Sequence, residues 1–195
     1  MSKAVLISIR PKWCEMIASG KKTIEVRKTA PKIETPFKCY IYCTNNGDTL
    51  YSVNGKVQPC NSFEINLKEN SRVSELNGYV IGEFVCDEIK TIDIPYPAYW
   101  TERHKQELDG SCLTLQKAHN YLGHDLGYGW HISELVVYDE PKPLTDFHKP
   151  VGSDCCKKCG YWEQEKCYHT AAAPLVKHCK ITRPPQSYKF AEELP

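Results

Sequence analysis

The chain has 195 residues, which is enough for one domain or for one domain with a small appendage. Its composition, 41% hydrophobic and 25% charged, is that of a globular protein and excludes a disordered tail. The net charge of +1 provides no overall basic field for nucleic acid, and no apolar run is long enough to span a membrane. The apolar stretch near the start is too short for a secretory signal, so we expect a cytoplasmic, reduced protein.

The charge is unevenly distributed along the chain. Residues 1–30 carry a net charge of +5, residues 31–141 a net charge of −7, and residues 142–195 a net charge of +3. A basic N-terminal segment can form a local anion or phosphate site, and the alternative is a set of solvated lysines at strand ends. With an acidic middle, a nucleoside, a short single strand or a flipped base is favoured over a long duplex.

The first thirty residues are predicted to form a strand, a short helix and a second strand. The expected ranges are 4–10, 11–19 and 21–28. Gly20 is the natural C-terminal stop of the helix. Because side chains alternate along a strand, Thr23, Glu25 and Arg27 are expected to share one face of the second strand. Three polar groups therefore line up directly after a helix–glycine turn.

The following hundred residues are predicted to contain more strands and two further helices. The expected strands are 37–44, 79–86 and 130–138, with a hairpin of 49–53 and 56–67, and the expected helices are 98–108 and 113–122. Gly82 inside a strand predicts a bulge or the close approach of another chain. Many strands with helices at the margins favour an α+β fold built on a small β-barrel or a strongly bent sheet.

Eleven cysteines fall into two groups. Six are scattered over the first 150 residues, several of them in apolar runs, where a thiol behaves as a small buried hydrophobe. The other five lie within 25 residues and are Cys155, Cys156, Cys159, Cys167 and Cys179. An odd total without a secretory signal argues against a disulfide framework, so the clustered thiols indicate a metal site.

A structural zinc site is the prediction for this cluster. Cys156, Cys159, Cys167 and Cys179 can close a tetrahedral site, because the C-x2-C pair places two thiolates on one tight turn. The alternative ligands are Cys155, His169 and His178. Zinc would fold a C-terminal extension, residues 148–195, that is too short and polar to build its own core, and its tail is expected to pack on the barrel. Reduced structural thiols without metal are the competing interpretation.

The N-terminal motif resembles the ASCH domain of the PUA-like superfamily. The resemblance is carried by Ile9-Arg10-Pro11-Lys12-Trp13 and by Gly20-Lys21-Lys22-Thr23-Ile24-Glu25-Val26-Arg27. Softer matches are Val80-Ile81-Gly82-Glu83-Phe84, Gly129-Trp130-His131-Ile132 and Pro184-Pro185-Gln186-Ser187-Tyr188. The resemblance covers most of residues 3–147, and we take 1–147 as one domain. It implies a PUA-like β-barrel with peripheral helices and a cleft that binds RNA or a modified nucleotide.

The expected cleft combines cations, one carboxylate and aromatic rings. Its ligand-binding residues are expected to be Lys12, Trp13, Lys21, Lys22, Thr23, Glu25, Arg27 and Trp130. Lysine and arginine can neutralise a phosphate, Glu25 can accept from a base amino group or a ribose hydroxyl, and tryptophan can stack on a base. The alternatives are a Glu25–Arg27 ion pair without a ligand, and Trp130 as core packing.

A hydrolase is the second functional hypothesis. One ASCH branch is similar to an amidohydrolase of N4-acetylcytidine, whose lysine falls on Lys22. Its threonine position is occupied by Glu25, so that nucleophile is missing here, with Thr23 two residues earlier. A ribonuclease-like branch would use Glu25 as the base, with Lys22 or Arg27 stabilising the phosphorane. We favour binding over catalysis, and a protein-interaction module without nucleic acid is the third hypothesis.

Overall fold

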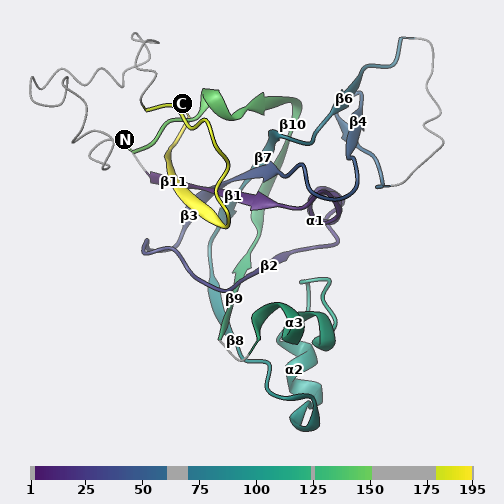
Figure 1. The fold of residues 1–195 in the computed structure, drawn as a ribbon, viewed down its shortest axis with the longest axis vertical. Helices are drawn as coiled ribbons and strands as arrows, with labels where there is room; N and C mark the ends of the chain where they lie inside the picture. Colours follow the sequence, from purple (N-terminus) through teal and green to yellow (C-terminus); the bar gives the residue numbers. More distant parts are fainter. Residues whose placement is uncertain (1–2, 61–69, 124–125, 151–178, 195) are drawn as a thin grey trace, which may run out of the picture.

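The computed structural model describes residues 3–60, 70–123, 126–150 and 179–194 (Figure 1). The strands are β1 (Lys3–Ile9), β2 (Ile24–Arg27), β3 (Phe37–Cys43), β4 (Tyr51–Val53), β5 (Lys56–Val57), β6 (Val73–Glu75), β7 (Tyr79–Cys86), β8 (Ile89–Ile92), β9 (Gly127–His131), β10 (Ser133–Pro143) and β11 (Tyr188–Glu192). The helices are α1 (Pro11–Ala18), α2 (Glu102–Gln106) and α3 (Leu115–Leu122), with short 3-10 turns at Pro97–Tyr99 and Leu144–Asp146. The α+β class is therefore confirmed.

The strands form three open sheets in the described part of the chain. The largest has the order β10-β7-β3-β1-β11, and the two small sheets have the orders β2-β9-β8 and β5-β4-β6. In the large sheet β1 runs parallel to β3, while the other neighbours are antiparallel. This sheet ends at two edge strands, β10 and β11. The described strands do not close into a barrel, so the prediction of a small β-barrel or a strongly bent sheet is confirmed only as an α+β fold made mostly of sheets.

The chain changes sheets at Ile132, where the sequence predicted one continuous strand over 130–138. β9 ends at His131 in one sheet, and β10 begins at Ser133 in another. The Ile132 N–H donates to the carbonyl of Thr23 at 2.8 Å, and the Ser133 hydroxyl donates to the carbonyl of Val85 at 2.9 Å. These bonds hold the chain in a corner at Ile132. The alternation of apolar residues along the sequence does not predict such a corner.

Gly82 lies where two strands approach closely, as the sequence predicted. A Cβ added there would collide with the backbone carbonyl of Val136 on β10. The pairing of β7 with β3 also shifts register between Ile41 and Tyr42, opposite this glycine. A residue with a side chain would push β10 away from β7.

Both faces of the large sheet are covered, and β3 shows how. Phe37, Cys39, Ile41 and Cys43 pack in one apolar cluster, together with α1. Tyr40 and Tyr42 point to the other face and join a second cluster. The side chains of β3 therefore alternate between the two faces, and both ends of the strand lie within the core.

The scattered cysteines largely follow their predicted role. Cys14, Cys39, Cys43 and Cys86 are buried in the first apolar cluster. Burial raises the pKa of the Cys39 thiol well above its ordinary value, so the sulfur stays protonated and behaves as an apolar group. Cys112 differs, because it is exposed in the loop before α3.

The two central helices are shorter than predicted and stand beside β8 and β9 (Figure 1). Gly110 and Gly123 follow them with φ values of 78° and 74°, in the left-handed region where glycine is favoured. The Thr114 hydroxyl accepts the Lys117 N–H at 3.3 Å and caps α3.

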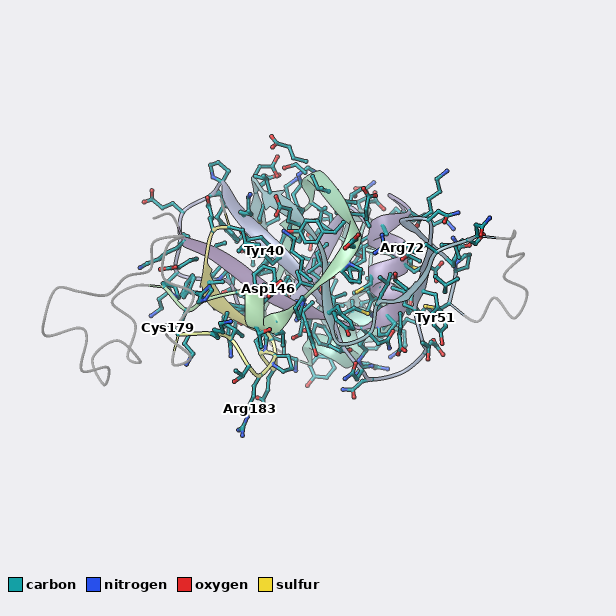
Figure 2. The ribbon with its side chains drawn as sticks, turned by 90° about the horizontal axis from the view of Figure 1, so that it is seen from above. Tyr40, Tyr51, Arg72, Asp146, Cys179 and Arg183 are labelled. Atoms are coloured by element: carbon teal, nitrogen blue, oxygen red, sulfur yellow. The ribbon has the colours of Figure 1, made fainter. Side chains whose placement is uncertain are left out.

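The C-terminal strand β11 completes one edge of the large sheet. It pairs with β1 in antiparallel register, from Lys3 opposite Glu192 to Ile7 opposite Tyr188. Cys179, earlier in the same C-terminal segment, is buried, and its carbonyl accepts the Lys149 N–H at 2.8 Å. Figure 2 shows Cys179 at the opposite end of the molecule from Tyr51 of β4.

The predicted zinc site lies almost entirely outside the described residues. Only Cys179 of its candidate ligands is described, and the others are Cys155, Cys156, Cys159, Cys167, His169 and His178. Zinc at this cluster stays a prediction. Within the described ranges, no helix is long and apolar enough to cross a membrane.

Candidate functional site

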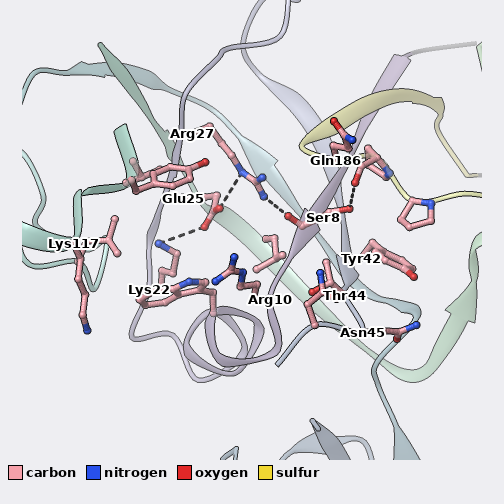
Figure 3. A pocket seen from close by; sticks show the side chains of 18 residues that line it. Ser8, Arg10, Lys22, Glu25, Arg27, Tyr42, Thr44, Asn45, Lys117 and Gln186 are labelled. Atoms are coloured by element: carbon pink, nitrogen blue, oxygen red, sulfur yellow. Dashed lines mark hydrogen bonds and ion pairs between the residues drawn. The ribbon is translucent and has the colours of Figure 1, made fainter. Parts of the chain in front are cut away.

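A cavity of about 730 Å³ opens between α1, β2, the end of β3, α3 and the segment 184–186. Figure 3 shows its lining side chains from close by. The volume falls in the usual range of small-ligand sites, roughly 300–1,000 Å³. These walls come from widely separated parts of the sequence, so the cavity is a product of the tertiary fold.

Backbone bonds hold the start of β2 against the loop before α3. The Gly110 carbonyl accepts both the Thr23 N–H, at 2.8 Å, and the Ile24 N–H, at 3.0 Å. The Lys22 N–H donates to the carbonyl of Met16 in α1 at 2.9 Å. Residues 22 and 23 therefore precede the strand, which begins at Ile24, and strict alternation of faces does not extend to them.

Lys22, Glu25 and Arg27 form a buried ionic triad in the cavity wall. The Lys22 Nζ lies 3.3 Å from the Glu25 Oε2, and the Arg27 Nε lies 3.0 Å from the Glu25 Oε1. All three side chains are less than 10% exposed. Two cations thus flank one carboxylate, leaving the triad with a net charge of +1.

The ammonium of Lys22 is fully engaged by the protein. Besides Glu25, it donates to the carbonyl of Ile24 at 2.8 Å and to the carbonyl of Ser111 at 2.7 Å. An ammonium has three N–H donors, and these three contacts use them. Lys22 therefore ties β2 to the loop that leads into α3, and it has no donor left for a ligand without breaking one of these bonds.

Arg27 has spare donors and links the triad to the C-terminal segment. Its Nη2 donates to the carbonyl of Ser8 on β1, and its Nε lies in the ion pair with Glu25, so two of its five N–H donors are engaged. The Ser8 hydroxyl in turn donates to the carbonyl of Pro185 at 2.7 Å. Figure 3 shows this chain of contacts across the cavity wall.

Further basic and aromatic side chains complete the lining. Arg10 and Lys117 join the triad, so the cavity carries four cations against one carboxylate. The rings are Trp13, Tyr42 and Tyr121. Burial raises the pKa of both tyrosines, and Arg27 only partly opposes this at Tyr121. Both phenols are therefore neutral hydrogen-bond donors at physiological pH.

The structure separates the predicted site residues into three groups. Trp13, Lys22, Glu25 and Arg27 line the cavity together. Lys12, Lys21 and Thr23 are exposed and do not line it. Trp130 does not either, because it is fully buried in the core.

Trp130 corrects the prediction of a stacking surface. Its exposed fraction is 0%, and its ring packs edge-on against Phe37 and Tyr188, with centroids 6.0 Å and 5.5 Å away. It cannot offer a face to a base. The alternative reading as core packing is the one that the structure supports.

Several residues that line the cavity were not predicted from the sequence. They are Ser8, Arg10, Thr44, Asn45, Lys117, Tyr121, Pro185 and Gln186. Lys117 and Tyr121 are four residues apart on α3, so the sequence indicates that they share one face of the helix. It does not indicate that this face borders the cavity. The tail that contains Gln186 was expected to pack on the barrel, but no local pattern predicted that β11 pairs with β1.

Comparison with known proteins identifies the fold. No family model matches the sequence, and no curated protein matches it. The crystal structure of an ASCH protein from Zymomonas mobilis is similar, with a TM-score of 0.50 and 18% identity over 97% of this chain and 88% of that chain. A variant of that protein with phenylalanine in place of a tyrosine gives a TM-score of 0.52 at 18% identity, over 98% of this chain and 92% of the other. A variant of the same protein with alanine in place of a serine gives a TM-score of 0.50 at 17% identity, over 97% of this chain and 89% of the other.

These matches cover nearly the whole chain but share few identical residues. At such identities the likeness establishes the fold alone. The chain therefore has the fold of an ASCH domain, as the N-terminal motif predicted.

Proposed function

We propose that the cavity binds a nucleotide unit of single-stranded RNA, or a modified nucleotide. The observation that carries the proposal is the pairing of an excess of three positive charges with three aromatic rings in one cavity of about 730 Å³. Phosphate is held by cations, and an unstacked base by aromatic faces. The ASCH-type fold agrees with this function, which the sequence motif also implies.

Arg27 and the two outer cations are the proposed phosphate contacts. Arg27 lines the cavity, and its contacts with Glu25 and Ser8 use two of the five N–H donors of its guanidinium. Arg10 and Lys117 are exposed at the cavity. Lys22 is assigned a supporting role instead, because its three donors already hold the protein together. Trp13, which lies 5.2 Å from the Lys22 Nζ measured to its ring centroid, is the proposed stacking platform.

A ribonuclease-like or amidohydrolase-like activity in the same cavity is the competing function. Glu25 is the only carboxylate among the lining residues. Each of its oxygens faces a cation, so its negative charge already serves two buried ion pairs. For this reason we place binding before hydrolysis, and we expect the RNA to remain intact in the assay below.

The test measures binding of a labelled single-stranded RNA of about ten nucleotides by fluorescence anisotropy at several salt concentrations. Arg10→Ala and Lys117→Ala should each weaken binding roughly 3- to 10-fold and lower the salt slope by about 0.7. Lys56→Ala removes an exposed lysine of β5 that does not line the cavity, and it should leave binding unchanged.

Three results bear against the proposal. Absence of RNA binding by the wild-type protein refutes it. Equal effects of Lys56→Ala and Lys117→Ala mean that RNA is held by nonspecific charge. Cleaved RNA, lost in Glu25→Gln while binding persists, favours the hydrolase.

A further inference from the structure

The cavity has two chemically different halves, which Figure 3 separates. The charged half, to the left in the view, comes from β2, α3 and the residues that precede α1 and β2. It contains Arg10, Lys22, Glu25, Arg27 and Lys117. The neutral half, to the right, comes from the end of β3, the residues after it and the C-terminal tail, and contains Tyr42, Thr44, Asn45 and Gln186. The neutral half offers hydroxyl and amide groups, which both donate and accept hydrogen bonds.

Thr44 presents an unsatisfied group in the neutral half. Its Oγ1 is buried and has no hydrogen-bond partner among the residues that the structure describes. Its backbone N–H donates to the carbonyl of Ile9 at 2.9 Å, so the residue is held directly beyond β3. Buried hydroxyls are normally paired, and a ligand that supplies the missing partner gains a well-positioned bond.

The backbone on both sides of Gln186 is held by β1. The Ser8 hydroxyl binds the carbonyl of Pro185 at 2.7 Å, and the Ser8 N–H binds the carbonyl of Ser187 at 3.0 Å. Directly afterwards, Tyr188 pairs with Ile7 of β1. The backbone that carries Gln186 is therefore anchored to the same strand that supports Arg27, so little backbone order has to be gained on binding.

From this arrangement we infer that Thr44 and Gln186 read the hydrogen-bonding edge of the base, while the charged half holds the phosphate. The inference rests on the proposed function and adds base specificity to it. A hydroxyl and a carboxamide discriminate bases because each base presents its own order of donors and acceptors, and a mismatch leaves one group unpaired. The C-terminal tail is then part of the binding site.

The experiment separates base recognition from phosphate binding. We would measure affinities for homo-octamers of adenosine, cytidine and uridine and for an abasic octamer with the same phosphates. The wild-type protein should prefer one homo-octamer about 10-fold over the abasic octamer. Thr44→Val and Gln186→Leu should each reduce this preference roughly 3- to 10-fold, with affinity for the abasic octamer unchanged within about 2-fold.

Matched controls make the result specific. Thr182→Val and Gln106→Leu make comparable replacements at exposed positions that do not line the cavity, and both should keep the preference. Thr44→Ser keeps a hydroxyl and should restore the preference lost in Thr44→Val. If Thr44→Val fails to fold, Gln186→Leu and Thr44→Ser carry the test.

The possible failures are distinguishable. If the wild-type protein binds no octamer, the proposed function fails and the inference with it. If it binds the abasic octamer as tightly as the others, or if Thr44→Val and Gln186→Leu leave the preference intact, only the inference fails. An equal loss of affinity for all octamers also refutes it, because the residues then do not read the base.

Discussion

Replacing Lys22 by methionine tests the assignment of this lysine as the tie between β2 and α3. Methionine keeps most of the side-chain length but removes the ammonium. The change leaves the carbonyls of Ile24 and Ser111 without their donor and leaves Glu25 with Arg27 as its only cation. Two charge-assisted hydrogen bonds contribute about 3 kcal/mol together, and the lost ion pair is offset by the desolvation that the ammonium no longer requires.

We therefore expect Lys22→Met to lower the free energy of unfolding by about 3 kcal/mol. Urea denaturation followed by far-UV circular dichroism measures this, and the melting temperature should fall by roughly 6–12 °C. Lys21→Met is the matched control, because the neighbouring lysine is exposed, and it should change stability by less than about 0.5 kcal/mol. Equal stabilities of the two variants would refute the reasoning.

Three further predictions follow from other parts of the structure. Trp130→Ala should cost about 3–5 kcal/mol in urea denaturation, because the ring is fully buried, and a loss below about 1 kcal/mol would contradict its place in the core. Burial opposes ionisation of Glu83, but hydrogen bonds from Tyr138 and Lys38 outweigh it and lower its pKa below the ordinary 4.5. Stability gained this way is present above about pH 4.5 and lost as the pH falls through the lowered pKa, so Tyr138→Phe should reduce the loss of stability between pH 6 and pH 3. Native mass spectrometry should find one zinc per chain that Cys159→Ala removes, and a metal-free wild-type mass after gentle purification would contradict the zinc prediction.

Local features of the fold were predictable because short-range rules govern them. The helix at Pro11, its end at Gly20, the alternation along β3 and the close approach at Gly82 each depend on neighbouring residues. The corner at Ile132 was not predictable, because the hydrogen bonds that hold it reach the carbonyls of Thr23 and Val85, which are far away in the sequence. The same holds for sheet closure, which depends on pairing between distant strands.

The candidate site was predictable only where its residues are close together in the sequence. The motif brought Lys22, Glu25 and Arg27 together because they lie within six residues, and the structure places them in one buried triad. Strand alternation misplaced Thr23, since β2 begins one residue later. Gln186 could not be assigned, because its wall of the cavity exists only once β11 pairs with β1.

Photo-cross-linking tests most directly whether this cavity is where RNA binds. A single-stranded RNA containing 4-thiouridine would be irradiated with the wild-type protein, and the cross-linked peptides would be mapped by mass spectrometry. We predict cross-links at Trp13, Tyr42 or Tyr121, the three rings of the cavity. Cross-links confined to residues 151–178, or to the small β5-β4-β6 sheet, would contradict the account and place RNA recognition elsewhere on the chain.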